Sequence, residues 1–260
     1  MPEGDTLFVT ARVLARALTG RLVTETQRDG RLSGACDFAG RTVTGVEARG
    51  KNLLIAFDDG RLLRTHLMMT GSWHLYRPGE RFRLPAHRAR LVLKTAEWWA
   101  VCFSAPVIEE LRAADLPRHP QLATLGPDIL KDDFDAVQAR ENLRAFPDEP
   151  LGVALMRQRA VAGIGNIWRC ETLFLLGLDP FRPVRERDDA VLDETLATAR
   201  RLMQESAAPY GGGRPGLGRP RMNVHDRAGQ PCFRCESVVR ARALGDPPRS
   251  LFHCPSCQTG

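Results

Sequence analysis

The sequence predicts a multidomain protein of the α+β class, and three features of the chain support this class. Residues 5–19 show apolar side chains near helical spacing, residues 41–103 consist of short β-rich runs broken by turn residues, and residues 151–207 are helical again. With 260 residues the chain is long enough to bury the cores of two domains. We therefore expect an N-terminal helix plus a β-sandwich, then a helical domain and a cysteine-rich C-terminal hairpin.

The β-rich half contains two pairs of candidate strands. Residues 52–57 and 61–67 flank Asp58-Asp59-Gly60, a sequence that favours a hairpin turn, and residues 90–95 and 98–103 form a second pair. Such short strands separated by turns are typical of a β-sandwich or barrel. The strands are expected to stop near residue 106.

Residues 106–150 are expected to hold short helical pieces and a connection marked by Pro and Asp. Three helices are expected after it, over residues 151–158, 167–176 and 188–206. A flexible Gly-rich stretch at 211–216 should separate them from the cysteine-rich end. The expected parts are an N-terminal β-sandwich domain at 1–115, an interdomain region at 116–150, a helical domain at 151–210 and a C-terminal segment at 211–260.

The net charge of +6 is concentrated at one end of the chain. Residues 211–260 contain eight arginines and three acidic residues, a balance of +5. A basic terminal segment suits a polyanion such as DNA, although a chain with 34 arginines and three lysines can also be arginine-rich throughout for reasons of composition. There is no leader-like stretch and no run of about 18 apolar residues, so we expect a cytoplasmic protein without a membrane span.

Four of the seven cysteines form two Cys-x-x-Cys pairs separated by 18 residues. Four thiolates at this spacing can close a tetrahedral zinc site, and a site with four protein ligands is structural because no position is open for catalysis. The alternative is disulfide or incidental pairing. The expected zinc ligands are Cys232, Cys235, Cys254 and Cys257, while Cys36, Cys102 and Cys170 are interpreted as small buried apolar residues.

The turn between the two expected helices at 151–176 has the sequence Gly163-Ile164-Gly165-Asn166. Glycine permits a positive φ or the close approach of a ligand to the backbone. Asn166 is expected at the N-cap, where its side-chain amide and the first backbone N–H groups of the helix can bind a phosphate. An ordinary packing corner between two helices fits this sequence equally well.

The N-terminus begins Met1-Pro2-Glu3. Removal of Met1 before a small residue would leave a free secondary amine on Pro2. A chain-terminal amine titrates near pH 8, against about 10.4 for lysine, so roughly a tenth of it is neutral at pH 7. Such an amine can attack a sugar C1′ and give an iminium ion directly, and Glu3 beside it can move protons.

Together, these motifs resemble the formamidopyrimidine-DNA glycosylase/endonuclease VIII family over the whole chain. The resemblance rests on the N-terminal Met-Pro-Glu-Gly, on a lysine in the turn Arg49-Gly50-Lys51, on Gly-Ile-Gly-Asn at 163–166 and on the terminal four-cysteine motif. It implies a β-sandwich domain, a helix–two-turn–helix domain and a zinc-finger β-hairpin, with DNA bound in the cleft between the domains. The implied cofactor is one structural Zn²⁺.

The resemblance also implies residue roles. Pro2 resembles the nucleophile that displaces the base and forms a Schiff base, and Glu3 resembles the acid/base of the ring opening and the eliminations. Lys51 is similar to the lysine that contacts phosphate and serves as a general acid.

Two further positions resemble the family's phosphate anchors. Asn166 corresponds to the helix–two-turn–helix asparagine and Arg249 to the zinc-finger arginine on the same backbone, and we count Arg249 among both the catalytic and the DNA-binding candidates. Met69 is similar in position to the residue that fills the space left by a flipped base. The alternative for Met69 is an ordinary core or strand methionine.

Within the family, the sequence is closer to the endonuclease VIII branch. Residues 102–111 lack the Asp-Pro-Arg-Arg-Phe-Gly loop of the formamidopyrimidine branch, and residues 209–222 are short and rich in Gly and Pro. The implied activity is a bifunctional DNA glycosylase/AP lyase of base excision repair that removes oxidised pyrimidines and cuts the strand by β,δ-elimination. Asp5-Thr6 replaces the Pro-Glu common in both branches, which leaves the base preference and the elimination efficiency open.

The implied partner is double-stranded DNA with damaged bases or abasic sites, bound by a monomer associated with the nucleoid. Two alternatives stay open. One is a non-catalytic zinc protein that binds damaged DNA, which needs neither Pro2 nor Glu3. The other is a glycosylase that prefers oxidised purines.

Overall fold

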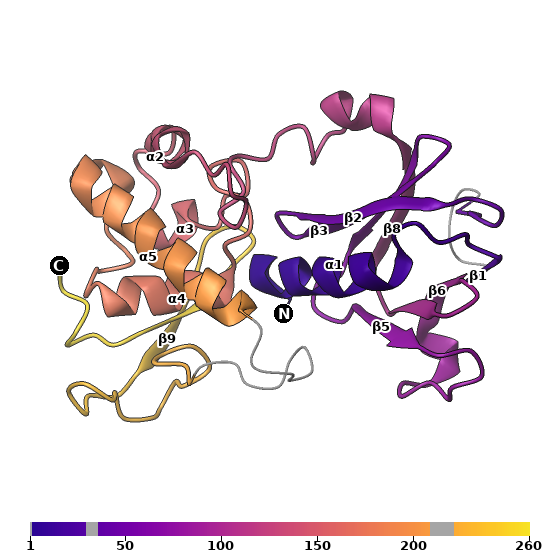
Figure 1. Ribbon diagram of the computed structural model, residues 1–260. Helices are drawn as coiled ribbons and strands as arrows, with labels where there is room; N and C mark the ends of the chain where they lie inside the picture. Colours follow the sequence, from indigo (N-terminus) through magenta and orange to yellow (C-terminus); the bar gives the residue numbers. More distant parts are fainter. Residues whose placement is uncertain (1, 30–35, 209–220) are drawn as a thin grey trace. The chain divides into compact units, whose positions relative to one another are not determined.

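The computed structural model describes residues 2–29, 36–208 and 221–260, and the chain forms two compact units (Figure 1). Unit 1 contains Pro2 and Thr6–Ala123, and unit 2 contains Glu3–Asp5 and Thr124–Gly260. The N-terminal arm Glu3–Asp5 therefore packs with residues that come more than a hundred positions later. Met1 and the Gly-rich stretch at 211–216 lie outside the described residues.

Unit 1 holds most of helix α1 (Gly4–Leu18) and two four-stranded antiparallel sheets. This confirms the expected N-terminal helix and β-sandwich. The first sheet has the strand order β1 (Glu25–Arg28), β6 (Ala89–Lys94), β7 (Trp99–Phe103) and β5 (Ser72–Tyr76). The second has the order β2 (Val43–Arg49), β3 (Asn52–Phe57), β4 (Arg61–His66) and β8 (Val107–Arg112).

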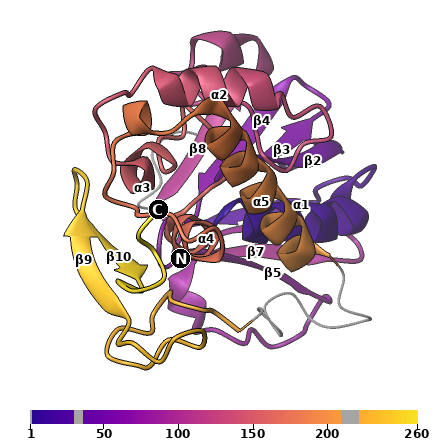
Figure 2. The same ribbon diagram turned by 90° about the vertical axis from the view of Figure 1, so that its left-hand side faces the viewer.

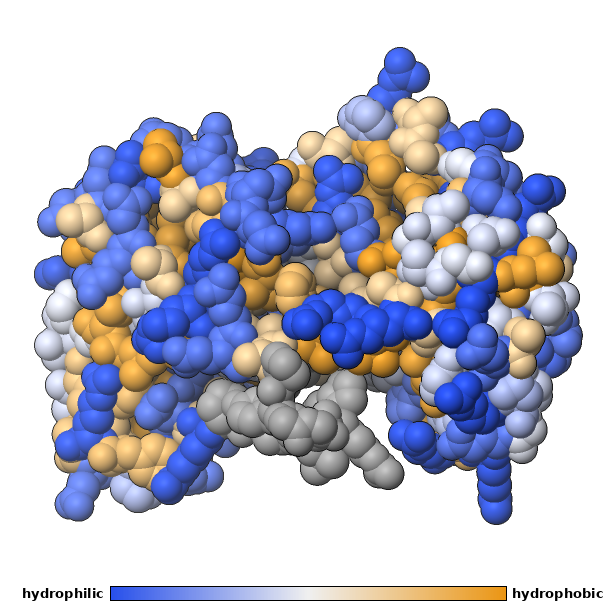
Figure 3. All heavy atoms as spheres, viewed as in Figure 1, coloured by the Kyte–Doolittle hydropathy of each residue, from blue (hydrophilic) through white to orange (hydrophobic). Residues whose placement is uncertain are grey.

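The core of unit 1 joins α1 to both sheets. One face of α1 contributes leucines at helical spacing, and alternate residues of the strands point into the same cluster because side chains alternate between the faces of a strand. The buried side chains include Leu7, Leu14, Leu18, Leu53, Ile55, Leu91 and Leu93. Figure 3 shows hydrophilic residues over most of one face of each unit, with hydrophobic residues in small patches between them.

The expectation that the strands stop near residue 106 is wrong, because β8 follows at Val107–Arg112. This strand pairs with β4 and carries two neighbouring acidic residues that meet arginines of β4. Arg64 Nη1 lies 2.7 Å from Glu109 Oε2, and Arg61 Nη1 lies 3.2 Å from Glu110 Oε1. Adjacent acidic residues are unusual in a strand, so the local sequence does not predict one. In the folded protein, arginines of β4 compensate their charges. The short edge strand β1 also lay outside the expected β-rich region.

Unit 2 is helical before its C-terminal hairpin. Its helices are α2 (Ala136–Arg144), α3 (Leu151–Ala154), α4 (Asn166–Leu175) and α5 (Asp189–Ala207). Both α2 and α4 pack against α5 (Figure 2). The side chain of Asp188 accepts a hydrogen bond from Val191 N at 2.8 Å and caps the N-terminus of α5. Short 3₁₀ turns lie at Ala86–Arg88, Ala113–Arg118 and Val184–Glu186.

The first of the three expected helices is shorter than predicted. It ends at Ala154 rather than at residue 158, and Met156 N and Arg157 N turn back to carbonyls three residues earlier. Gln158 is drawn into the following loop, where its Oε1 accepts from Gly163 N at 3.0 Å and its Nε2 donates to Ile164 O at 2.9 Å. These two hydrogen bonds hold Gln158 in the loop, and it could not make them if the helix continued to residue 158.

The C-terminal segment forms the expected two-stranded hairpin of β9 (Arg240–Leu244) and β10 (Arg249–His253). Strand β10 packs against α4, and a small core of Phe174, Val239 and Leu251 lies with the cysteines beneath it. Among the described residues, no helix has the length and apolar composition that a membrane crossing requires.

Candidate functional site

The site is built around the N-terminal arm. Glu3 is fully buried, and its carboxylate accepts hydrogen bonds from Ile167 N at 2.8 Å and Trp168 N at 3.4 Å. These are first-turn N–H groups of α4, where a helix has unsatisfied donors and a favourable dipole for a negative charge. The sequence fits a phosphate site and an ordinary packing corner equally well here, and in the structure Glu3 occupies these two N–H groups.

The glycines of the loop before α4 make room for this arm. Gly4 N donates to Gly163 O at 3.0 Å. A Cβ on Gly165 would lie 2.3 Å from Glu3 Cδ, so no larger residue fits there without moving the carboxylate. Gly163 has a φ of +106°, which disfavours any other residue. The loop therefore serves to seat the arm of the same chain.

Pro2 immediately precedes the anchored Glu3 and is only partly buried. Glu3 and Gly4 are hydrogen-bonded to the first turn of α4 and to the loop before it. Pro2 is bonded covalently to Glu3, which limits how far it can move. Pro2 is thus attached to a fixed segment and stays partly exposed.

Asn166 is the first residue of α4 and Gly165 is the N-cap, so the expected N-cap position of Asn166 is wrong by one residue. Its Nδ2 donates to Ser250 O at 2.9 Å, and its Oδ1 accepts from Nε of Arg169 at 3.0 Å and from Nη2 at 2.7 Å. Asn166 is thereby joined to the C-terminal hairpin.

Arg169 was not among the sequence candidates, although it organises the site. It is 1% exposed, donates to Gly152 O at 2.7 Å and reaches Arg249 O at 3.4 Å. Burial lowers the pKa of Arg169 from its usual value. The sequence did contain an indication of this contact, because a residue three positions after Asn166 lies on the same face of the helix.

The segment at 223–225 is fixed to α4 beside Asn166, and this too was not anticipated. The buried carboxylate of Glu171 accepts four hydrogen bonds from it, from the backbone N–H groups of Asn223, Val224 and His225 and from the Asn223 amide, at 2.8–2.9 Å. The ring Nε2 of His225 then lies 3.4 Å from Asn166 Nδ2.

Lys51 lies in the two-residue turn between β2 and β3, whose ladder closes at the pair Arg49–Asn52. Gly50 has a φ of +57°, as this tight turn requires. Asn52 Nδ2 donates across the turn to Arg49 O at 3.1 Å, and Arg64 Nε holds Asn52 Oδ1 at 3.0 Å. Lys51 is 9% exposed, so its turn is a tightly held part of unit 1.

Met69 is 69% exposed, and the alternative of a buried core methionine is therefore wrong. It follows Met68, whose φ is +48° and whose N–H donates to His66 Nδ1 at 3.2 Å. Burial, together with the charges of Arg64 and Lys51, lowers the pKa of His66 to about 4. His66 is thus neutral near pH 7 and keeps its acceptor nitrogen.

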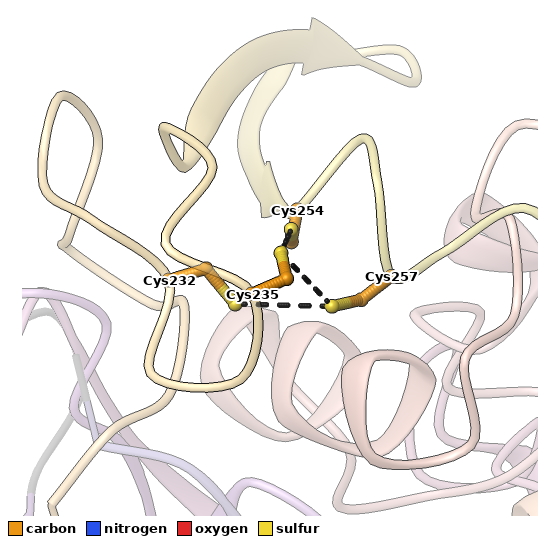
Figure 4. A group of neighbouring side chains, drawn as sticks. All are labelled: Cys232, Cys235, Cys254 and Cys257. Atoms are coloured by element: carbon orange, nitrogen blue, oxygen red, sulfur yellow. Dashed lines mark hydrogen bonds between the residues drawn. The ribbon is translucent and has the colours of Figure 1, made fainter.

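The four predicted metal ligands lie together at the base of the hairpin (Figure 4). All four Sγ atoms are within 4.8 Å of one another, with Cys235–Cys254 at 3.5 Å, Cys232–Cys257 at 3.9 Å and Cys235–Cys257 at 3.3 Å. A tetrahedral zinc site with Zn–S bonds of about 2.3 Å has sulfur separations of about 3.8 Å. A disulfide needs about 2.05 Å, so the cluster fits a metal and excludes the disulfide alternative.

The cysteine cluster is connected to α4 through Arg234. Its guanidinium donates to Phe174 O at 3.1 Å and to Leu175 O at 3.2 Å, two carbonyls in the last turn of the helix. The Cys232–Cys235 loop that holds Arg234 therefore caps the helix whose N-terminus receives Glu3.

Comparison with known proteins agrees with this architecture. The family model described as the formamidopyrimidine-DNA glycosylase N-terminal domain matches residues 1–106, and the H2TH domain model matches residues 125–214. A probable endonuclease 8 2 from Streptomyces coelicolor is 41% identical over 265 residues, covering 100% of this chain and 95% of that protein. The chain belongs to the formamidopyrimidine-DNA glycosylase/endonuclease VIII family.

Other family members are similar over the same length. A DNA-(apurinic or apyrimidinic site) lyase Nei2 from Mycolicibacterium smegmatis is 34% identical, covering 100% of this chain and 99% of that protein. A solved formamidopyrimidine-DNA glycosylase from Lactococcus lactis, bound to DNA containing an abasic site, has a TM-score of 0.85 with full coverage of both chains. Its identity is 22%, so this likeness concerns the fold.

For a member of this family, the structure groups the candidate residues in two sets. In unit 2, Glu3, Asn166 and the backbone of Arg249 are joined by α4 and Arg169, with Pro2 covalently attached to Glu3. In unit 1, Lys51 lies in the turn of the β2–β3 hairpin, and Met69 lies in the turn between β4 and β5, which belong to different sheets.

Proposed function

We propose that this chain is a bifunctional DNA glycosylase and AP lyase of base excision repair that acts through its N-terminal proline. The observation that carries the proposal is the burial of the Glu3 carboxylate on the N-terminus of α4, which places Pro2 on a fixed arm. The printed names of the relatives, endonuclease 8 and AP lyase, support the same activity.

In the proposed reaction, the neutral Pro2 nitrogen attacks C1′ of the damaged nucleotide. The N–C1′ bond forms as the glycosidic bond breaks, and the base leaves with the bonding electron pair and a proton. The proline nitrogen then loses its proton, and the C1′–O4′ bond breaks as O4′ is protonated, so the sugar ring opens to an iminium ion. The iminium acidifies the C2′ hydrogen, loss of that proton expels the 3′ phosphate, and loss of the C4′ proton in a second elimination expels the 5′ phosphate. Glu3 accepts and returns the protons of these steps.

The other candidate residues hold the DNA in this proposal. Lys51 contacts a phosphate and acts as a general acid, and Asn166 and Arg249 bind the backbone beside the lesion, with Arg249 close enough to the reacting nucleotide to count as catalytic. Met69 fills the space that a flipped base leaves, which suits its exposed apolar side chain.

One Zn²⁺ held by Cys232, Cys235, Cys254 and Cys257 would cross-link the hairpin and supply folding free energy. The four-sulfur ligand set leaves no position for substrate, so every chemical step falls to the side chains and the terminal amine.

The proposed substrates are oxidised pyrimidines in double-stranded DNA, and abasic sites. The endonuclease 8 names support the pyrimidine preference, while a formamidopyrimidine-DNA glycosylase from Methylococcus capsulatus, 33% identical over 285 residues, keeps oxidised purines as a second candidate. We expect the protein to act as a monomer on nucleoid DNA in the cytoplasm.

Borohydride trapping tests the activity. The mature wild-type protein, with removal of Met1 checked by mass spectrometry, should become covalently attached to duplexes containing an abasic site, thymine glycol or 5-hydroxycytosine. Pro2→Gly, or a protein that retains Met1, should trap at least about tenfold more slowly. A wild-type protein that binds these duplexes but never traps would favour the non-catalytic damaged-DNA-binding alternative, and faster cleavage of 8-oxoguanine would favour the purine alternative.

A further inference from the structure

Asp5 is a buried acidic residue that the proposed reaction does not use. It is 4% exposed, and its Oδ2 accepts a hydrogen bond of 2.7 Å from Ser206 Oγ. A hydroxyl bonded to a carboxylate at this distance is among the stronger hydrogen bonds in proteins, so the pair is a defined attachment.

The attachment point on the other side is the last turn of α5. Ser206 is the penultimate residue of that helix, and Met203 lies three positions earlier on the same face. Met203 is fully buried, and its Cε would lie 3.1 Å from a Cβ on Gly4. The end of α5 thus packs on the N-terminal arm through one apolar contact and one hydrogen bond.

These contacts give the arm a third fixed point. Glu3 is held by α4 and Gly4 by Gly163 O, and both of these attachments lie in the segment 163–168. Asp5 adds an attachment to a different helix, because its carboxylate accepts a hydrogen bond from Ser206 of α5. Loss of the Ser206 hydrogen bond would therefore weaken the attachment of the arm to α5.

We propose that Asp5 and Ser206 are positioning residues, which hold the N-terminal arm between α4 and α5 so that the Pro2 nitrogen meets C1′ in a reactive geometry. This inference rests on the proposed function. Effective intramolecular attack depends on sub-ångström placement of the reacting atoms, and Pro2 is linked to Asp5 by only two intervening residues. The pair then affects the rate of bond formation rather than DNA binding.

The test compares Ser206→Ala with Ser206→Thr and with Gln204→Ala as a matched control. Gln204 is exposed on the same final turn of α5. Single-turnover borohydride trapping on abasic-site DNA gives a rate and an amplitude, and binding to a tetrahydrofuran duplex gives a Kd. We expect Ser206→Ala to lower the rate about fivefold to twentyfold, with the amplitude and the Kd within twofold of wild type. Ser206→Thr, which keeps a hydroxyl, and Gln204→Ala should stay within twofold in all three quantities.

The amplitude separates positioning from a merely structural role. A loss of folded protein lowers the amplitude and the thermal midpoint at an unchanged rate, whereas a misplaced nucleophile lowers the rate itself. An unchanged trapping rate in Ser206→Ala, or a change confined to the amplitude, would overturn the proposal.

A double-mutant cycle completes the test. If Ser206 acts through the Asp5 carboxylate, Ser206→Ala should cause no further loss of rate in an Asp5→Ala background, and additive losses would contradict the pairing. The proposed function fails separately, since in that case the wild-type protein itself does not trap on abasic DNA.

Discussion

At Gly165, the packing of another side chain requires glycine, and the backbone conformation of the residue itself does not. Its φ of −127° and ψ of −161° are extended values open to any residue. The space for a side chain is nevertheless taken by the Glu3 carboxylate, 2.3 Å from the position of a Cβ. The glycine is therefore required by packing against a residue 162 positions earlier in the chain.

Gly165→Ala should displace Glu3 from the N-terminus of α4 while leaving the loop backbone unstrained. We expect single-turnover trapping on abasic DNA to slow by about a hundredfold or more, because both the proton transfers and the placement of Pro2 depend on Glu3. Gly45→Ala is the matched control, since nothing lies within 4 Å of its Cβ position. Equal trapping rates for the two alanine variants would contradict this role of Gly165.

His66 gives a second prediction at the residue scale. Its folded-state pKa of about 4 lies below the ordinary value of 6.5, because burial and the charges of Arg64 and Lys51 disfavour the imidazolium. As the pH falls from about 6.5 to about 4, the unfolded chain takes up the proton before the folded one does. The stabilisation from neutral His66 is thus complete above about pH 6.5 and is lost through this window.

The measurement is the free energy of unfolding of the wild type relative to His66→Gln across that pH range. The difference should shrink as the pH is lowered, and the His66 ring resonance should titrate near pH 4 rather than near 6.5. A ring that titrates at the ordinary value would contradict the effect of burial and of the Arg64 and Lys51 charges on His66.

At the scale of elements, the four-cysteine hairpin and α4 depend on each other. The Cys232–Cys235 loop places Arg234 on the last carbonyls of α4, and β10 supplies Ser250 O to Asn166 at its start. A metal bound by the cluster therefore stabilises both ends of the helix through the hairpin.

Removal of the metal, by a chelator or by Cys257→Ser, should lower the thermal midpoint of unfolding. It should also weaken binding to a tetrahydrofuran duplex by roughly tenfold or more, because the hairpin contacts of Asn166 and Arg249 are lost. Cys102→Ala is the control, since Cys102 lies in β7 of unit 1 and is not in the four-cysteine cluster. Elemental analysis should give one zinc per chain for wild type and Cys102→Ala. Full DNA affinity in metal-free protein would contradict the dependence.

At the scale of the whole molecule, the distribution of charge along the chain determines where a polyanion is attracted. Residues 211–260 carry a balance of +5 out of a net +6, so a polyanion is attracted chiefly to the C-terminal part of the chain. Binding that neutralises phosphates releases counterions and weakens with salt.

The affinity for the tetrahydrofuran duplex should therefore fall linearly with the logarithm of salt concentration. Arg249→Ala should reduce the magnitude of this slope by about one. Arg185→Ala, which removes an exposed arginine paired with Asp148, should leave the slope unchanged. An unchanged slope in Arg249→Ala would mean that its guanidinium does not reach a phosphate.

Much of the fold could be predicted from local patterns. Helical spacing indicated α1 and α5, turn residues indicated the β3–β4 and β6–β7 hairpins, and cysteine spacing indicated the metal cluster. The failures were local patterns that distant contacts override, such as β8, whose acidic residues are matched by arginines of β4, and the helix that ends early because Gln158 bonds to the loop.

The sequence by itself determined which chemistry is available, namely a terminal secondary amine, a neighbouring carboxylate and four thiolates at metal spacing, because residue type and short spacing are sufficient for these. Only the tertiary structure decided that Glu3 occupies the helix start, that Arg169 joins Asn166 to the hairpin, and that Asp5 meets Ser206. These contacts link residues up to 201 positions apart, and their partners follow from how the helices pack.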